Sequence, residues 1–136
     1  MSKKLEHGRY SIELHADCIV ICELIGTFNK EGVAAWILEM HSTIETIKEK
    51  PFGLLIDVRH YAGATEDALE AADSFHQWLG NSMLVCQAHV ISSPTLYSIS
   101  ISRLPSLKLH EVKSFLRIDE ACAWIVEKLK KQNNIV

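Results

Sequence analysis

The side chains in this sequence that are best suited to chemistry lie close together, between Asp57 and Asp67. Asp57 precedes His60 by three positions, and an Asp–His pair can orient an imidazole ring for proton transfer. No nucleophile in a sharp elbow motif accompanies this pair in the sequence. We therefore predict that the protein is not an enzyme and assign no catalytic residue. An enzymatic alternative requires Asp57, His60 and Tyr61 to converge in a cleft.

The seven histidines and four cysteines do not have the spacing of a metal site. The histidines form no His-x-x-x-His or Glu-x-x-His pattern, and the cysteines form no Cys-x-x-Cys pattern. Gly-rich and Walker-type phosphate motifs are absent as well. We predict no metal and no cofactor. We expect the cysteines to be inert, reduced thiols that mostly lie in the core: Cys18, Cys22, Cys86 and Cys122.

A buried strand and an acidic helix start must position the residues around Asp57. Residues 52–58 contain consecutive apolar side chains, which is typical of a strand covered on both faces. Residues 59–64 indicate a loop, and residues 65–79 indicate a helix with carboxylates in its first turn. Partners often dock where loops leave the carboxyl ends of parallel strands. We predict a partner-binding surface that consists of Arg59, His60, Tyr61, Thr65, Glu66 and Asp67.

The segment before this strand predicts a hairpin and a long helix. Residues 10–14 and 18–25 have strand patterns on either side of a tight turn at Ala16-Asp17, and residues 26–28 leave the second strand. Asn29 is a predicted N-cap for the helix. Residues 30–48 carry one apolar face at helical spacing.

The segment after residue 79 continues the alternation of strands and helices. Residues 83–91 and 112–116 predict strands, and Asp119 is a predicted cap of a final helix. Residues 95–104 fit either a helix or a strand, and Ser93-Pro94 favours a short helix because proline is tolerated at a first helical position. The order ββαβαβαβα predicts an α/β fold with a five-stranded mixed sheet. Its first hairpin strand is antiparallel, the rest are parallel, and about four helices flank it.

Composition limits the function classes. The chain has 136 residues, 48% of them hydrophobic and 23% charged, so we expect one globular domain over residues 1–136. The formal net charge of −3 argues against nucleic acid as a partner. No apolar run is long enough to span a membrane, and the first ten residues do not resemble a signal peptide. We therefore expect a cytoplasmic protein.

At this level of detail the chain resembles the STAS group, specifically the bacterial SpoIIAA-like proteins. The resemblance is carried by the opening YSIELHADCIVICELIGTF, by the strand GLLIDV and by the close VKSFLRIDEACAWIVEKL. It implies a mixed sheet flanked by helices and a role in protein contacts. A related layout occurs in CRAL-TRIO domains, which bind apolar lipids.

The resemblance also implies a candidate phosphorylation site. Anti-sigma factor antagonists of this family are phosphorylated on a serine at the start of the second helix, where backbone N–H groups can hold a phosphate. Thr65 stands at about that point and is the candidate phosphoacceptor. The family's Asp-Ser-Ser-Gly-type pattern is absent here, and Thr-Glu-Asp is also an ordinary helix start.

Two function hypotheses follow. The first is a non-enzymatic, STAS-like protein-interaction module that acts through the surface defined above. The alternative is a carrier of a small apolar ligand or lipid, with CRAL-TRIO-like character. Apolar helix residues also fit a homodimer, and Trp78 or Phe75 would form an exposed apolar patch if their helix cannot bury both.

Overall fold

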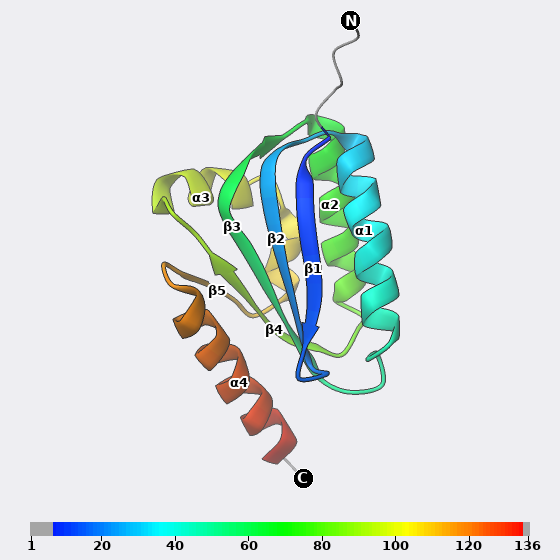
Figure 1. The fold of residues 1–136 in the computed structure, drawn as a ribbon, viewed down its shortest axis with the longest axis vertical. Coiled ribbons are helices and arrows are strands. Elements are labelled where there is room, and N and C mark those ends of the chain that lie inside the picture. Colours follow the sequence, from blue (N-terminus) through cyan, green and yellow to red (C-terminus); the bar gives the residue numbers. More distant parts are fainter. Residues whose placement is uncertain (1–6, 135–136) are drawn as a thin grey trace, which may run out of the picture.

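The computed structural model describes residues 7–134, which form one five-stranded sheet with helices on both faces (Figure 1). The strands are β1 (Arg9–His15), β2 (Ile19–Phe28), β3 (Phe52–Ala64), β4 (Leu84–Val90) and β5 (Val112–Phe115). The helices are α1 (Lys30–Glu45), α2 (Glu66–Leu79), α3 (Pro94–Ile101) and α4 (Ile118–Asn134), with a short 3-10 helix η1 (Pro105–Leu109). The strand order is β1-β2-β3-β4-β5. β1 and β2 are antiparallel and the other pairs are parallel, so the predicted fold class is confirmed.

The turn between β1 and β2 has the geometry that a tight hairpin requires. Ala16 and Asp17 have φ values of 54° and 57°. Two successive positive φ angles match the twist of the flanking strands. The predicted hairpin is therefore confirmed, and it fixes the register in which Ser11 lies opposite Glu23.

Helices α1 and α2 cover one face of the sheet, and α4 covers part of the other (Figure 1). On the first face, Trp36 of α1 meets Phe75 of α2 edge to face, with ring centroids 5.3 Å apart. On the second face, Ile125 of α4 is fully buried against the strands. α4 approaches β3 closely because position 53 is glycine: a Cβ there would collide with the Ile125 side chain.

Two predicted strand ends are wrong, because β2 and β3 pair for longer than their sequences suggest. β2 continues through residues 26–28, and the expected loop at residues 59–64 is the second half of β3. Gly26 and Gly63 have φ values of 83° and 125°, which L side chains rarely adopt. These glycines let both strands bend, and the pairing of Phe28 with Ala64 satisfies backbone groups that a loop would leave to water.

The helix predictions are confirmed with shifted ends. Asn29 caps α1 by accepting a hydrogen bond from the Gly32 N–H at 2.9 Å, but α1 ends at Glu45 instead of residue 48. Ser93 caps the short helix α3 in the same way, through the Leu96 N–H. Helix η1 was not predicted. α4 begins at Ile118, so Asp119 lies inside the first turn and not at the cap.

Candidate functional site

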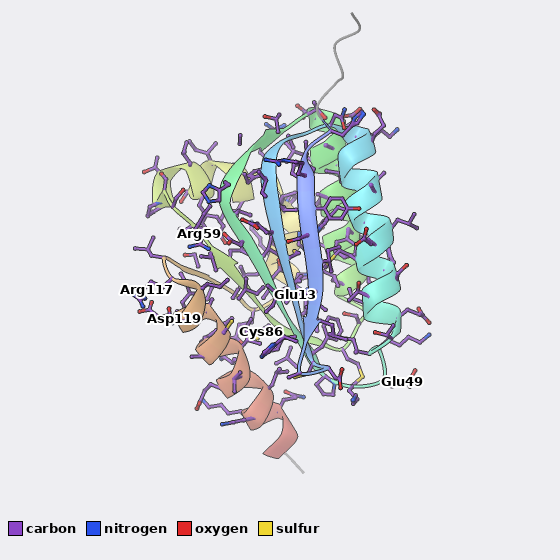
Figure 2. The ribbon with its side chains drawn as sticks, in the orientation of Figure 1. Glu13, Glu49, Arg59, Cys86, Arg117 and Asp119 are labelled. Atoms are coloured by element: carbon purple, nitrogen blue, oxygen red, sulfur yellow. The ribbon has the colours of Figure 1, made fainter. Side chains whose placement is uncertain are left out.

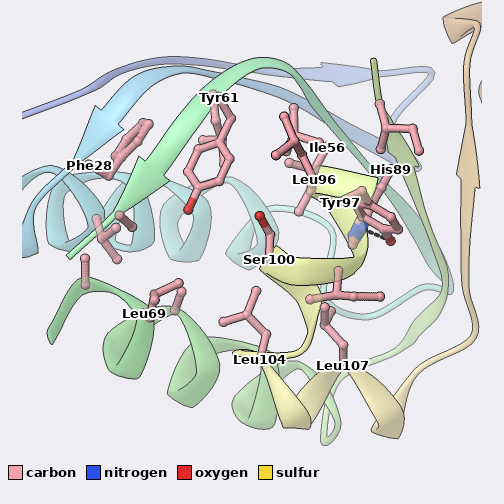
Figure 3. Close-up of a pocket in the computed structure, with 18 of the residues that line it drawn as sticks. Phe28, Ile56, Tyr61, Leu69, His89, Leu96, Tyr97, Ser100, Leu104 and Leu107 are labelled. Atoms are coloured by element: carbon pink, nitrogen blue, oxygen red, sulfur yellow. Dashed lines mark hydrogen bonds between the residues drawn. The ribbon is translucent and has the colours of Figure 1, made fainter. Parts of the chain in front are cut away.

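A pocket of about 130 Å³ lies between the sheet, α2, α3 and the segment that leads to η1 (Figure 3). The strands contribute apolar side chains to its roof, and α3 closes it from the side. The side chains that line it include Phe28, Trp36, Ile56, Val58, Tyr61, Ala64, Ala68, Ala72, His76, His89, Leu96, Tyr97, Ser100 and Leu104.

An irregular register in β3 brings Tyr61 to this pocket. Glu23 of β2 pairs with Asp57 of β3, and Ile25 of β2 pairs with His60 of β3. Between these two pairs β2 advances by two residues and β3 advances by three. The extra residue is a β-bulge, which reverses the alternation of side chains beyond it. Without the bulge Tyr61 would share a face with Asp57. With it, Tyr61 lines the pocket together with Val58.

Small side chains leave the space that forms the pocket. Ala68 and Ala72 are four residues apart on α2, so they lie on one side of the helix, and both line the pocket together with Ala64, the last residue of β3. Ala68 is fully buried. Larger side chains at these positions would fill the space between α2 and the strands.

Helix α3 forms a wall of the pocket without being part of the core. None of its residues is buried, and Leu96 and Ile99 are 66% and 60% exposed. Its attachments are polar and few. Tyr97 bonds to His89 of β4 at 2.6 Å, and Arg103, just beyond the helix, forms an ion pair with Glu66 at 2.6 Å.

The buried polar groups around the pocket are neutral. The two ring nitrogens of His89 lie 2.6 Å from the Tyr97 hydroxyl and 2.6 Å from Oε1 of Gln87. Because Oε1 can only accept, His89 donates from Nε2 and accepts from Tyr97 at Nδ1. Burial lowers the pKa of His89 to about 3. Burial, with a smaller effect of His110, lowers the pKa of His76 to about 4. Both imidazoles are therefore uncharged at neutral pH.

The hydroxyl groups of the two tyrosines are also neutral. Burial raises the pKa of Tyr97 to about 12 and raises the pKa of Tyr61 above its ordinary value. No Lys, Arg, Asp or Glu side chain lines the pocket. The pocket can therefore hold an apolar group and offer it hydroxyl groups, but it offers no charge.

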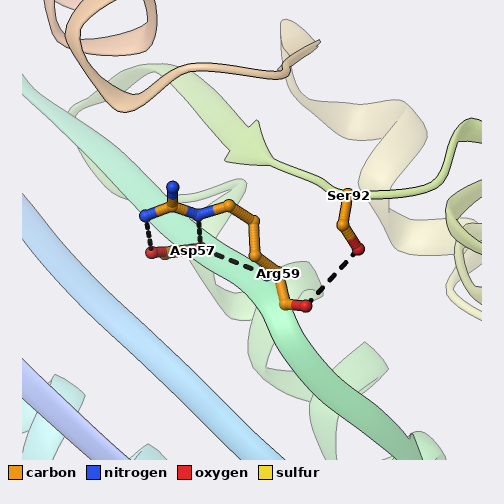
Figure 4. Close-up of polar contacts among 3 residues, drawn as sticks. All are labelled: Asp57, Arg59 and Ser92. Carbon is orange, nitrogen blue, oxygen red and sulfur yellow. Dashed lines mark hydrogen bonds and ion pairs between the residues drawn. The ribbon is translucent and has the colours of Figure 1, made fainter.

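The predicted partner surface is divided between two environments. Arg59 lies on the sheet face opposite the pocket, where it binds the buried carboxylate of Asp57 (Figure 4). Its Nε and Nη2 donate to Oδ1 and Oδ2 at 3.0 and 2.7 Å, and its backbone N–H donates to Oδ1 at 3.1 Å. Burial raises the pKa of Asp57, but the hydrogen bonds from Arg59 outweigh it, so the pKa lies below its ordinary value.

The rest of the predicted surface is exposed, apart from Tyr61. His60, Thr65, Glu66 and Asp67 are all accessible to solvent. The Thr65 hydroxyl donates to Oδ1 of Asp67 at 2.6 Å and does not cap the helix, although Thr65 occupies the N-cap position. By the register of β3, His60 lies on the same face of the sheet as Asp57. Thr65, Glu66 and Asp67 belong to the start of α2, and Tyr61 lines the pocket (Figure 3).

The residues of the enzymatic alternative do not converge. Asp57 is bound by Arg59 on the face of the sheet opposite the pocket (Figure 4), and Figure 2 shows the place of Arg59 in the molecule. Tyr61 lies on the pocket face. The β-bulge between them is the physical reason, because it sends the two side chains to opposite faces. This arrangement contradicts the single cleft that the enzymatic alternative requires.

Within residues 7–134, no group of three or more His, Cys, Asp and Glu side chains could hold a metal ion. None of the helices within the same range has both the length and the apolar character to cross a membrane. The four cysteines are free. Burial raises the pKa of Cys22 and of Cys86 to about 12, as expected of unreactive thiols.

Sequence reasoning missed the α3 wall of the pocket. Leu96, Tyr97, Ser100 and Leu104 recur at helical spacing, which the sequence does contain. That spacing indicates a helix face, but it does not say whether the face meets a packed core or a cavity. The cavity depends on alanines of α2, which are distant in sequence.

The fold is similar to two solved structures. One is the crystal structure of an uncharacterised DUF3478-family protein with a SpoIIAA-like fold from Shewanella loihica PV-4, with a TM-score of 0.68 and 19% identity over 92% of this chain and 98% of that one. The other is the anti-sigma factor antagonist SpoIIAA in its unphosphorylated form, with a TM-score of 0.60 and 10% identity over 88% of this chain and 98% of that one. No family model and no curated protein matches the sequence. The chain has a SpoIIAA-like fold, which confirms the resemblance at the level of the fold.

Proposed function

We propose that this protein is a non-enzymatic binding module that takes a small apolar ligand into the pocket between the sheet, α2 and α3. One observation carries the proposal: the pocket has an apolar and uncharged lining, and its volume of about 130 Å³ is not filled by side chains. Native cores are close-packed, with few voids larger than a water molecule. Pockets that bind small molecules are concave and mostly apolar, with a few polar groups that orient the ligand.

The geometry supports the apolar-ligand hypothesis more directly than the protein-contact hypothesis. Trp36, Phe28 and Ile56 are core residues that nevertheless line open space. An empty apolar cavity is destabilising, because its lining forfeits packing contacts. A bound apolar molecule would restore those contacts. The free cysteines are also in keeping with the cytoplasmic location that we propose.

Occupancy of the pocket can be tested by native mass spectrometry and by NMR with xenon, which enters dry apolar cavities. We expect a co-purified small molecule, or xenon-dependent methyl shifts at Ile56 and Val58. In the variant Ala72→Leu, which fills the pocket, both signals should disappear. Ala123→Leu is the matched control, because Ala123 is exposed on α4 on the opposite face of the sheet. Failure to detect either signal in the wild type would contradict the proposal.

A second candidate function is protein contact through the start of α2, at Thr65, Glu66 and Asp67, or through Arg59 and His60 on the other face of the sheet. It is favoured by the exposure of these side chains, which include the carboxylates of Glu66 and Asp67 directly after the end of β3. SpoIIAA, which shares the fold, is an anti-sigma factor antagonist. Homodimer formation and phosphorylation of Thr65 stay predictions.

The second candidate can be tested by comparing proteins captured from source cells by three baits. The baits are the wild type, Glu66→Lys/Asp67→Lys and a control with the same charge change on α4, Glu120→Lys/Glu127→Lys. We expect one or more proteins to be lost only with the first variant. Identical capture by all three baits would exclude the start of α2 as the contact surface.

A further inference from the structure

The lining of the pocket restricts the charge of its ligand. No carboxylate, ammonium or guanidinium group lines the pocket. Two histidines line it, His76 and His89, and both are buried. An ionised ligand group would therefore lose its hydration without gaining an opposite charge, which is strongly unfavourable. Carboxylate and phosphate headgroups are therefore excluded from the interior of the pocket.

The charged residues nearest to the pocket already have partners. Asp57 and Arg59 bind each other on the opposite face of the sheet. Glu66 pairs with Arg103 at the surface. Asp73 of α2 accepts hydrogen bonds from the backbone and the hydroxyl of Ser106 at 2.8 and 2.9 Å. Recruiting any of them as a counter-ion would break an existing interaction.

The volume restricts the size of the ligand. An apolar cavity of about 150 Å³ binds benzene, and the pocket here measures about 130 Å³. It therefore suits a compact molecule built on a single six-membered ring. A long acyl chain would need α3 to move away from the sheet.

Two hydroxyl groups give the pocket a polar end. Figure 3 shows the hydroxyls of Tyr61, from β3, and Ser100, from α3, pointing into the same space from opposite sides. The Tyr97 hydroxyl, in contrast, is engaged by His89 at 2.6 Å. Hydroxyls can both donate and accept hydrogen bonds. Tyr61 and Ser100 can thus recognise one small polar group on an otherwise apolar molecule.

Building on the proposed function, we infer that the pocket selects an uncharged, compact aromatic or alicyclic molecule with one hydroxyl, carbonyl or ring N–H group, which lies between Tyr61 and Ser100. Affinity comes from the apolar body of the ligand. The two hydroxyl groups determine its orientation and distinguish it from a plain hydrocarbon.

The test is calorimetric and NMR titration of the full chain with p-cresol, toluene, 4-methylbenzoate and palmitate. We expect p-cresol to bind about 3- to 10-fold more tightly than toluene, the effect of one hydrogen bond. 4-Methylbenzoate at pH 7.5 should bind at least about 100-fold more weakly than p-cresol, because its charge would be buried. Palmitate should not bind. Tyr61→Phe/Ser100→Ala should reduce p-cresol affinity to that of toluene and leave toluene binding unchanged, which also shows that the variant is folded.

The outcomes separate this inference from the proposed function. If palmitate binds one to one in an Ala72→Leu-sensitive way and p-cresol does not, the inference is wrong but the pocket still binds an apolar ligand. If 4-methylbenzoate binds as tightly as p-cresol, the argument from charge is wrong. If none of the four probes binds, both the inference and the proposed function are overturned.

Discussion

The ion pair of Arg59 with Asp57 and the ion pair of Arg117 with Asp119 differ mainly in how deeply the carboxylate is buried. The Asp57 side chain is 6% exposed, whereas Asp119, which Arg117 binds with the same two-pronged geometry, is 64% exposed. Breaking a pair is costly when it leaves a buried charge without a partner, and nearly neutral when the charge is hydrated. The two pairs are therefore a matched comparison within one protein.

We predict that Arg59→Leu lowers the free energy of unfolding by about 1–3 kcal/mol at pH 7, less than a fully buried pair because Arg59 is partly exposed. Arg117→Leu should change it by less than about 0.5 kcal/mol. Urea titrations followed by circular dichroism measure both values. Equal effects of the two substitutions would contradict the role that we assign to burial.

The two buried histidines predict a loss of stability in mild acid. Burial lowers the pKa of His76 and His89 in the folded state to about 4 and about 3, below the value of about 6.5 in an unfolded chain. Between these values the unfolded state binds more protons, so the free energy of unfolding decreases as the pH falls from about 7. We expect a loss of about 2 kcal/mol for each histidine by pH 5.

This pH dependence can be measured by urea unfolding at pH 7.5, 6 and 5. His76→Gln should remove about half of this pH dependence, because one of the two groups that titrate on unfolding is removed while His89 stays. His15→Gln, at an exposed position of β1, should leave the slope unchanged. A wild-type curve that is level down to pH 5 would show that neither buried imidazole stays neutral.

For single residues, the sequence predicts whether a side chain is exposed better than it predicts toward which face of the sheet the side chain points. Glu66 and Asp67 were expected in the exposed first turn of α2, and they lie there. Tyr61 was expected beside them at the surface, but it lines the pocket. The difference arises from one bulged residue in β3, and a bulge depends on the register with β2, which local sequence does not determine.

The elements were predictable where local chemistry decides them. Asn29 and Ser93-Pro94 mark the starts of α1 and α3 with side chains that satisfy free N–H groups, and both starts are confirmed. The second half of β3 was not predictable, because RHYAGA has the composition of a loop. It becomes a strand only because β2 extends alongside it to Phe28.

Position 53 shows how one residue controls the packing of a whole helix. A side chain at Gly53 would collide with Ile125 of α4, in a core that cannot expand freely. We predict that Gly53→Ala destabilises the protein by about 2 kcal/mol. In an Ile125→Ala background, where the colliding side chain is shortened, the same substitution should cost clearly less. Additive effects in this double-mutant cycle, measured in urea, would contradict the direct contact.

The whole molecule has a closely packed part, which is the sheet with α1, α2 and α4, and a weakly attached part, which is α3. α1, α2 and α4 bury their apolar sides against the sheet, whereas α3 has no buried residue and is held by a few polar contacts. The pocket lies between these two parts (Figure 3). Regions with few buried contacts open locally at low free energy. If the pocket binds a ligand as proposed, we expect the ligand to enter by local opening of α3.

This arrangement predicts where a ligand slows hydrogen exchange. Opening of α3 would break up the binding site, so p-cresol at 100 times its dissociation constant should slow exchange of α3 amides about 100-fold. The last turn of α1, which ends at Glu45 far from the pocket, can fray without disturbing the site, so its exchange should not change. Ala72→Leu should abolish the effect on α3. If the ligand binds and raises the melting temperature while α3 amides exchange as before, then α3 opens without disrupting the ligand and is not a wall of the site.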